Sequence, residues 1–158
     1  MTRAGLADIP VDECRDILTR SRWGRLQVVV EGKTTTLAVQ HVFDPRTISV
    51  VVPVTSVLGW PRSSDYPVVF EVDWIEPAEH GRRTVTVVGP ATEVTDPAET
   101  ARLAALRVDS WVPCEAIRWL RIQAGHTTGR RRSGPSSNRH WPRHLCRAWS
   151  RAARPRGL

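Results

Sequence analysis

The sequence predicts a mainly β protein (α+β), with short flanking helices and antiparallel strands that close, fully or partly, into a barrel. Three observations support this fold class. Six runs rich in valine, isoleucine and threonine have the length of β-strands and are separated by short turn signals. Only two segments have helical periodicity. These two helices do not alternate with the strands as they would in a doubly wound fold.

The first predicted element is a helix from Pro10 to Arg20. Its apolar residues recur at helical spacing, a proline suits the first position, and two acidic residues complement the positive end of the helix dipole. Strands are then predicted at 26–30 and 34–39. The turn Glu31-Gly32-Lys33 joins them into a hairpin.

A turn at 43–46 leads to a predicted strand at 47–52. This strand is apolar on both faces and is therefore expected to be central in its sheet. Residues 53–65 contain two prolines, a glycine and three serines, so we expect a loop there.

Strand patterns return at 67–75 and 83–94, with a bulge predicted at Gly89-Pro90. Asp96 then precedes a proline at the first helical position, which predicts a second helix from 97 to about 107. The last predicted strand, 116–122, alternates apolar and basic residues and is expected to be half-exposed.

The positive charge is confined to one end of the chain. The 158 residues have a formal net charge of +7, but residues 130–158 hold nine arginines and no acidic residue, while the first 129 residues carry 14 basic and 16 acidic side chains. We therefore predict one domain at 1–131 and a basic tail at 132–158, which we expect to be disordered.

Common catalytic and ligand-binding motifs are absent from the sequence. It contains no dinucleotide-binding or Walker glycine loop, no nucleophile elbow, and no histidine or cysteine cluster spaced for a metal. The three cysteines are widely spaced, which predicts reduced thiols. No apolar run approaches the roughly 20 residues that span a bilayer, so we expect a cytoplasmic protein with no membrane partner.

Seven blocks of the sequence are notable for their order and spacing: Ile9–Leu18, Trp23–Leu26, Val39–Val42, Pro67–Asp73, Val87–Val94, Trp111–Pro113 and Thr128–Arg131. No single block is specific by itself. Together, from Ile9 to Arg131, they resemble the pyridoxamine 5'-phosphate oxidase-like FMN-binding split β-barrel family of actinobacterial type.

The resemblance implies a six-stranded antiparallel split β-barrel that forms a homodimer, with FMN in each of two clefts at the dimer interface. It also implies hydride transfer to or from a small-molecule substrate that the sequence does not identify. Some relatives use the deazaflavin F420, and others bind haem or have no known reaction. The expected cofactor is therefore FMN, with F420 or no cofactor as alternatives.

Several cofactor-binding positions follow from the resemblance. Gln40 and His41 occupy the strand that lines the isoalloxazine in the family. Arg83 stands where the family usually has a tryptophan, and a cation there could help to bind an anionic cofactor.

The phosphate cations of the family are missing. Counting back from Pro67–Asp73 without gaps puts Val52 and Leu58 at the two positions where the family has arginine and lysine. Each lost charge-assisted hydrogen bond costs about 1.5–3 kcal/mol. The remaining candidate phosphate donors are Thr55, Ser56, Arg62, Ser63 and Ser64.

Two other functions stay open at this stage. A degenerate split barrel that has lost its phosphate contacts could serve as a binding or dimerisation module. The basic tail could bind nucleic acid through its arginines and tryptophans. The composition of the tail is also that of GC-rich coding sequence read in another frame, which is the interpretation we favour.

Overall fold

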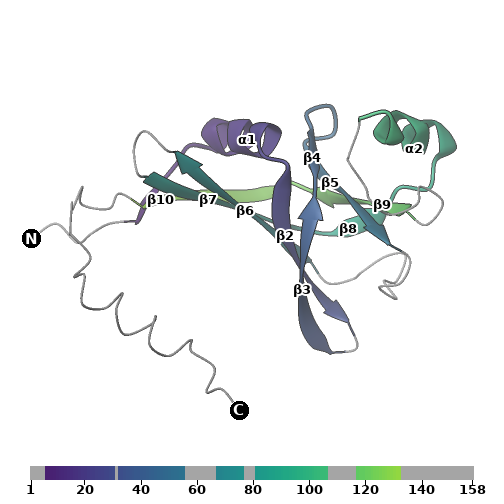
Figure 1. The fold of residues 1–158 in the computed structure, drawn as a ribbon, viewed down its shortest axis with the longest axis horizontal. Helices are drawn as coiled ribbons and strands as arrows, with labels where there is room; N and C mark the ends of the chain where they lie inside the picture. The colour runs from purple at the N-terminus through teal and green to yellow at the C-terminus, as the bar shows by residue number, and fades with distance from the viewer. Residues whose placement is uncertain (1–5, 31, 56–66, 77–80, 107–116, 133–158) are drawn as a thin grey trace, which may run out of the picture.

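The computed structural model describes residues 6–30, 32–55, 67–76, 81–106 and 117–132. It is mainly β, with two short helices that both lie above the sheets in Figure 1. The predicted loop at 53–65 lies outside the described residues from position 56 onward, and the predicted tail does so from position 133.

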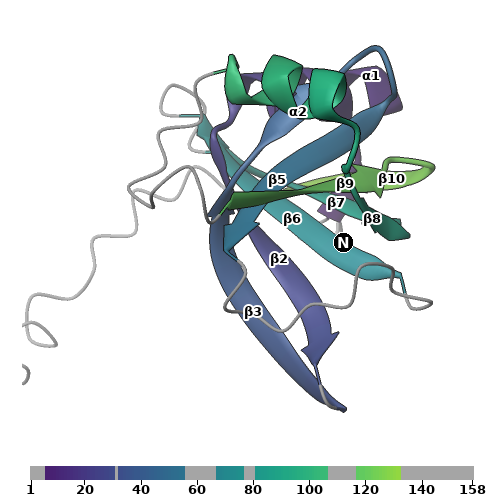
Figure 2. The same ribbon diagram turned by 90° about the vertical axis from the view of Figure 1, so that its right-hand side faces the viewer.

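Six strands form the larger sheet, and every neighbouring pair in it is antiparallel. The long hairpin of β2 and β3 projects away from the helices in Figures 1 and 2. In spatial order the strands are β1 (Leu6–Asp8), β10 (His126–Arg132), β7 (Gly81–Gly89), β6 (Val68–Glu76), β2 (Trp23–Val30) and β3 (Lys33–Gln40).

The smaller sheet contains β4 (Val42–Asp44), β5 (Ser49–Thr55), β9 (Ile117–Gln123) and β8 (Ala91–Glu93), in that spatial order. The chain passes between the sheets at Pro90, so the single strand predicted at 83–94 is two strands that belong to different sheets. A Cβ on Gly89 would lie 2.2 Å from the carbonyl oxygen of Gln123, and this close approach requires glycine.

The inner faces of the two sheets share one hydrophobic core, and together they form a split barrel. Phe70 and Val85 of the larger sheet and Val52 and Leu120 of the smaller sheet are almost completely buried in it. Burial of this shared apolar surface stabilises the packing of the two sheets against each other.

Helix α1 (Val11–Arg20) confirms the first predicted helix. Its buried residues are Cys14, Ile17 and Leu18, whereas Val11 is 46% exposed. The helix packs closely on β10, because a Cβ at Gly129 would lie 2.4 Å from the Cys14 sulfur. The glycine of the Thr128–Arg131 block is thus explained by helix packing.

Helix α2 (Pro97–Ala104) begins as predicted, with the Asp96 side chain accepting a hydrogen bond from the Glu99 backbone N–H, and it ends three residues earlier than predicted. Leu103 packs against Val51 and Trp119, which form a second small core on the outer side of the smaller sheet.

An ion-pair group, here called the α2 cluster, ties α2 to the sheet. Arg102 binds both Asp44 and Glu99 at 2.6 Å, and Arg121 of β9 also binds Glu99. The Asp44 side chain is only 1% exposed. It also accepts hydrogen bonds from the backbone N–H of Arg46 and the hydroxyl of Thr47, which close the turn between β4 and β5.

Strand β5 continues through Pro53, although proline was expected to end it. Strand β9 pairs with β5 along its whole length, but β4 pairs only with residues 49–51. At Pro53 the β4 side of β5 therefore has no strand partner among the described residues. A missing N–H is tolerated at such an edge.

Strand β10 was not predicted as a strand, so 116–122 is not the last one. Its sequence has no apolar period, and only Gly129 in it is buried. Seven residue pairs with β7 hold it in the sheet through backbone hydrogen bonds. Arg130 and Arg131 are therefore part of the sheet.

Candidate functional site on the larger sheet

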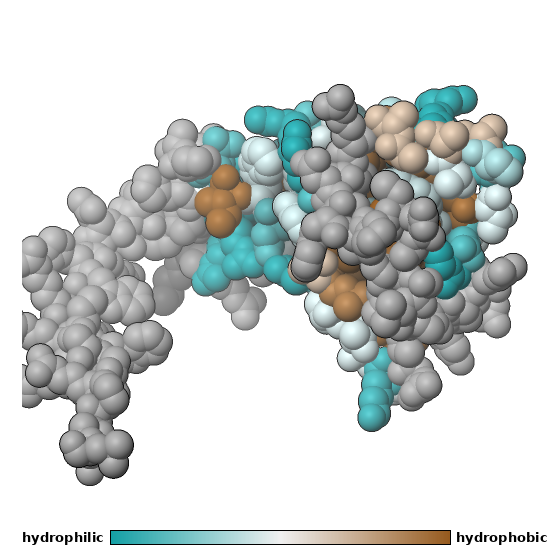
Figure 3. Space-filling model, turned by 45° about the vertical axis from the view of Figure 1, so that its right-hand side comes forward, coloured by the Kyte–Doolittle hydropathy of each residue, from teal (hydrophilic) through white to brown (hydrophobic). Residues whose placement is uncertain are grey.

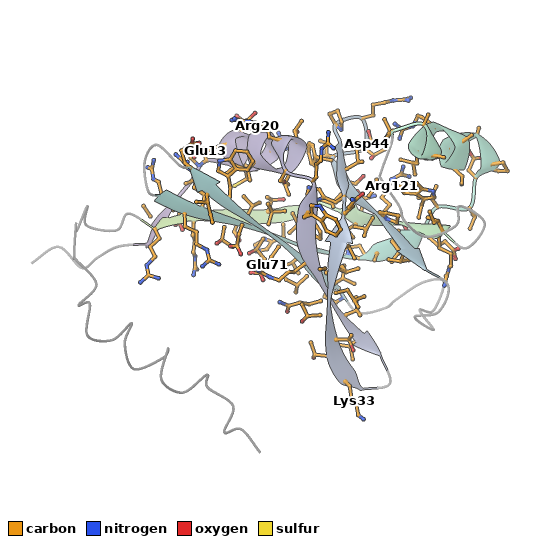
Figure 4. The ribbon with its side chains drawn as sticks, viewed as in Figure 1. Glu13, Arg20, Lys33, Asp44, Glu71 and Arg121 are labelled. Atoms are coloured by element: carbon orange, nitrogen blue, oxygen red, sulfur yellow. The ribbon has the colours of Figure 1, made fainter. Side chains whose placement is uncertain are left out.

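The side of the larger sheet that faces away from the core is here called the open face. Neighbouring strands bring Arg25, Glu71, Thr86 and Thr128 into one row across it. Side chains two residues along a strand share a face, so Asp73, Thr84 and Arg130 form the next row. Figure 4 shows Glu71 on the side of the sheet opposite to Glu13 and Arg20 of α1.

A cavity of about 410 Å³ opens on this face, lined by Glu71, Thr84, Thr86, Thr128 and Arg130. All five of these residues are polar or charged, which distinguishes the cavity from the hydrophobic core on the other side of the same strands. On the face shown in Figure 3, the coloured residues form small brown and tan patches that alternate with teal and white areas.

Asp73 is the centre of a charged network beside the cavity. Its carboxylate lies 2.8 Å from Arg25 and 2.9 Å from Arg82, and it accepts a 2.7 Å hydrogen bond from the Thr84 hydroxyl. Burial acts to raise the pKa of Asp73, but these hydrogen bonds and charges outweigh it and hold the pKa below its usual value. Asp73 is therefore an anion at neutral pH.

Glu71 forms longer contacts inside the cavity. It accepts hydrogen bonds of 3.4 Å from the side chains of Thr86 and Gln27, and it lies 3.7 Å from Arg25. Arg130 differs from Arg25 and Arg82 on the same face, because no described residue forms an ion pair with it. The cavity thus has one cation whose hydrogen-bonding capacity is unused within the described part of the chain.

Gln40, a predicted cofactor residue, lies on the open face at the end of β3. Its cross-strand partner is Trp23, which is 53% exposed and lies two residues before Arg25 on the same side of β2. Gln40 is half-buried. The structure therefore puts Gln40 on the same face as the cavity, with β2, β6 and β7 between Gln40 and Arg130.

His41, the other residue predicted to line the isoalloxazine, lies in the interior of the protomer and is 4% exposed. Its Nε2 lies 3.0 Å from the carbonyl oxygen of Leu18 and 3.2 Å from the Ser21 hydroxyl, at the end of α1. Its ring packs edge-on against Phe70 with centroids 4.9 Å apart. In the protomer, then, His41 fixes the end of α1, and its contact with an isoalloxazine stays a prediction.

Burial lowers the pKa of His41 and outweighs the hydrogen bonds that favour its charged form. The ring is therefore neutral at physiological pH. A neutral ring at this position is consistent with its packing against Phe70 in the core.

Arg83 points to the α1 side of the sheet, not to the open face. Its Nε lies 2.8 Å from a carboxylate oxygen of Glu13 in the first turn of α1, and the side chain is 13% exposed. His41 contacts the last turn of the same helix. Arg83 and His41 are therefore at opposite ends of α1.

Of the remaining positions considered for the phosphate, the structure describes the side chain of Val52 and the backbone of Thr55. Val52 is completely buried in the shared core, so a cation at this position would lie inside the barrel and not in a surface cleft. Thr55 ends β5. Ser56, Leu58 and Arg62 lie outside the described residues, as do Ser63 and Ser64.

Sequence reasoning missed the residues that line the cavity, although one signal was available. In Glu71-Val72-Asp73 and Thr84-Val85-Thr86 every second residue is polar, which predicts a solvated side of each strand. Their convergence was not predictable from spacing, because it depends on the pairing of β6, β7 and β10.

The described ranges contain neither a membrane-spanning helix nor a metal-binding cluster. Neither α1 nor α2 is long and apolar enough to span a membrane. No group of three metal-ligating side chains occurs among these residues. Cys14 is buried and not in a disulfide.

The fold and the site together define an antiparallel split-barrel domain with a polar cavity on the outer face of its larger sheet. The chain belongs to the pyridoxamine 5'-phosphate oxidase family, which matches residues 10–131. The match begins at the N-cap of α1 and reaches into β10. No protein with a curated description matches the sequence significantly.

Solved structures share the fold at low sequence identity. The FAD binding protein from Mycobacterium smegmatis superposes with a TM-score of 0.67 at 22% identity, over 82% of this chain and all of the other. A conserved protein of unknown function from Corynebacterium diphtheriae gives 0.65 at 22%, over 79% and 96%. An FAD-binding protein from Mesorhizobium loti gives 0.65 at 20%, over 80% and 97%.

Proposed function

We propose that the protein is a homodimeric flavin-dependent oxidoreductase, with FMN or the deazaflavin F420 bound at the open face, that transfers a hydride to or from a small-molecule substrate. The observation that carries this proposal is the polar cavity on the open face of a family domain. FAD-binding proteins among the structural relatives support a flavin cofactor in general.

The side chains present suit such a cofactor in their chemistry. A flavin needs hydrogen-bonding groups for its polar ring edge and donors for its phosphate. Gln40 offers an amide on the open face beside the exposed ring of Trp23. Thr128 and Arg130 offer donors in the cavity. By contrast, Val52 does not suit the phosphate, because its side chain is inside the core.

When bound, the flavin supplies the hydride chemistry, and the protein has a supporting role. Gln40 would orient the polar edge of the ring. The guanidinium groups of Arg25, Arg82 and Arg130 would offset the carboxylates of Glu71 and Asp73, so that an anionic cofactor meets no excess of negative charge. No catalytic side chain is assigned.

The dimer would form through the open face, because the larger sheet leaves that side uncovered by α1 and α2 (Figure 4). Charged residues of both signs are present there, so that a second copy can place arginines opposite carboxylates. Analytical ultracentrifugation of the full chain tests this directly, and a monomer at tens of micromolar would contradict it.

A second candidate is a split-barrel module without a cofactor, used for binding or dimerisation. The observation in its favour is Val52, which occupies the position expected for a phosphate cation and is fully buried. Under this hypothesis the cavity binds a ligand that is not a flavin.

The absorbance spectrum of the purified full-length protein, from the near ultraviolet through the visible, separates the two candidates. A flavoprotein is expected to show bound flavin as purified, or to quench the fluorescence of added FMN or F420. A colourless protein that binds neither compound at tens of micromolar would refute the proposed oxidoreductase and favour the module.

A further inference from the structure

The cavity on the open face has separate donor and acceptor regions. The Thr84 hydroxyl donates to Asp73 and the Thr86 hydroxyl donates to Glu71, so these two oxygens remain available as acceptors. The Glu71 carboxylate is a further acceptor. The lining groups left as donors are Arg130 and the hydroxyl of Thr128, which has no hydrogen bond to another described residue.

This division specifies the class of ligand. The Arg130 end requires an acceptor, and a guanidinium binds an oxyanion most strongly. The Glu71 end requires donors, which hydroxyl groups on a ligand would provide. A phosphate ester joined to a chain of hydroxyls satisfies both ends.

The charges around the cavity allow an anion to bind. Glu71 and Asp73 are both in contact with Arg25, and Asp73 is also paired with Arg82. Their negative charge is thus largely balanced before Arg130 is counted. Asp8 is next to Arg130 on β1, but it is exposed and forms no ion pair with it.

We propose that this cavity binds the ribityl phosphate arm of a flavin mononucleotide, with Arg130 as the phosphate cation in place of those absent at positions 52 and 58. This inference rests on the proposed flavin-binding function. Arg130 belongs to β10, and none of the phosphate positions predicted from the sequence lies on that strand.

The test compares FMN with riboflavin, which has the same ring and ribityl chain but no phosphate. Dissociation constants for both are measured by fluorescence quenching on the full-length protein, on Arg130→Gln, and on Arg132→Gln as the matched control. Arg132 is an exposed arginine two residues further along β10 that does not line the cavity. The ³¹P resonance of bound FMN gives a second readout.

The unchanged protein is expected to bind FMN at least about tenfold more tightly than riboflavin, as the loss of one charge-assisted contact implies. Arg130→Gln should abolish this preference while leaving riboflavin affinity the same, and the ³¹P shift should move toward that of free FMN. Arg132→Gln should keep the preference.

Two negative results of this experiment would have different meanings. If FMN binds and Arg130→Gln leaves the ratio of FMN to riboflavin affinity unchanged, the phosphate assignment is wrong and the proposed function stands. If the unchanged protein binds no flavin, both are wrong. Circular dichroism of Arg130→Gln must match the unchanged protein, and Thr128→Val provides a second variant that should reduce the same ratio.

Discussion

Arginines and carboxylates meet in two parts of the molecule, the α2 cluster and the open face. In the α2 cluster every charged group has a partner, and the central carboxylate of Asp44 is 1% exposed. On the open face the central carboxylate of Asp73 is 19% exposed, and beside it lies a cavity with Arg130, which forms no ion pair with any residue that the structure describes. Arginines and carboxylates therefore stabilise the packing of the helix in the α2 cluster, whereas on the open face they leave hydrogen-bonding groups available for a ligand.

The pKa values express this difference. Hydrogen bonds from Arg102, and after them from Arg121, lower the pKa of Glu99 to about 2 against the opposing effect of burial. The hydrogen bonds that Arg102 donates to Glu99, and after them the one that it donates to Asp44, raise the pKa of Arg102. Such a closed group has no capacity left for a ligand, so its loss should affect stability and not binding.

The largest expected effect is that of Asp44→Ala. Removing this carboxylate leaves the partly buried side chains of Arg102 and Arg121 with Glu99 as their one remaining carboxylate partner among the described residues, and it opens the turn that Asp44 closes. We expect a loss of about 3 kcal/mol in the free energy of unfolding, measured by urea denaturation. A loss below about 1 kcal/mol would mean that the α2 cluster is no more important for stability than a surface ion pair.

Asp73→Asn on the open face should lower the free energy of unfolding by a smaller amount, about 1 kcal/mol. The arginine partners of Asp73 are 44% and 56% exposed, so water can replace much of the interaction. The same denaturation experiment measures it. Asp12→Asn is the matched control, since Asp12 is 87% exposed, and it should have no measurable effect. Equal losses for Asp44→Ala and Asp73→Asn would remove the distinction between the two regions.

Acid should weaken the α2 cluster in a defined range. The pKa of Glu99 is lowered from 4.5 to about 2 in the folded protein, so its stabilising contribution is present above pH 4.5 and is lost as the pH falls toward 2. In Glu99→Gln the stability should therefore depend less steeply on pH between 4.5 and 2. Thermal unfolding of both proteins across this range measures the slopes, and identical slopes would contradict the role of Glu99.

The smallest expected effect is that of Arg82→Gln. This arginine pairs with Asp73 at 2.9 Å but is 56% exposed, and Arg25 remains to hold the carboxylate. The free energy of unfolding should change by less than about 0.5 kcal/mol. A larger loss in thermal unfolding would show that the open-face network has a structural role comparable to that of the α2 cluster.

The regular elements were predictable where side-chain periodicity coincides with burial. Helices α1 and α2 and strands β2, β3, β5, β6, β7 and β9 have such patterns, and their types are confirmed, whereas the short strand β4 begins where a turn was predicted. Prediction failed at β10, whose polar residues have no apolar period, and at Pro90, where one strand pattern continues while the chain changes sheets.

The candidate site was predictable only in part. The family resemblance selected Gln40, which does lie on the open face, and Arg83, which instead binds Glu13 on the other side of the sheet. The side on which a strand residue lies follows from its register, and a count without gaps does not reveal the register. Counting likewise assigned Val52 to the position of a phosphate cation, and only the fold shows that its side chain lies in the core.

By itself, the sequence determined the fold class, the positions of most elements and the family, because each depends on local patterns of apolar residues and on the order of short blocks. Only the tertiary structure decided which polar residues meet. Glu71, Thr86 and Thr128 are up to 57 positions apart in the chain, yet antiparallel pairing puts them in one row across β6, β7 and β10. Strand pairing is a long-range interaction, and for that reason the cavity and Arg130 within it emerged only from the folded chain.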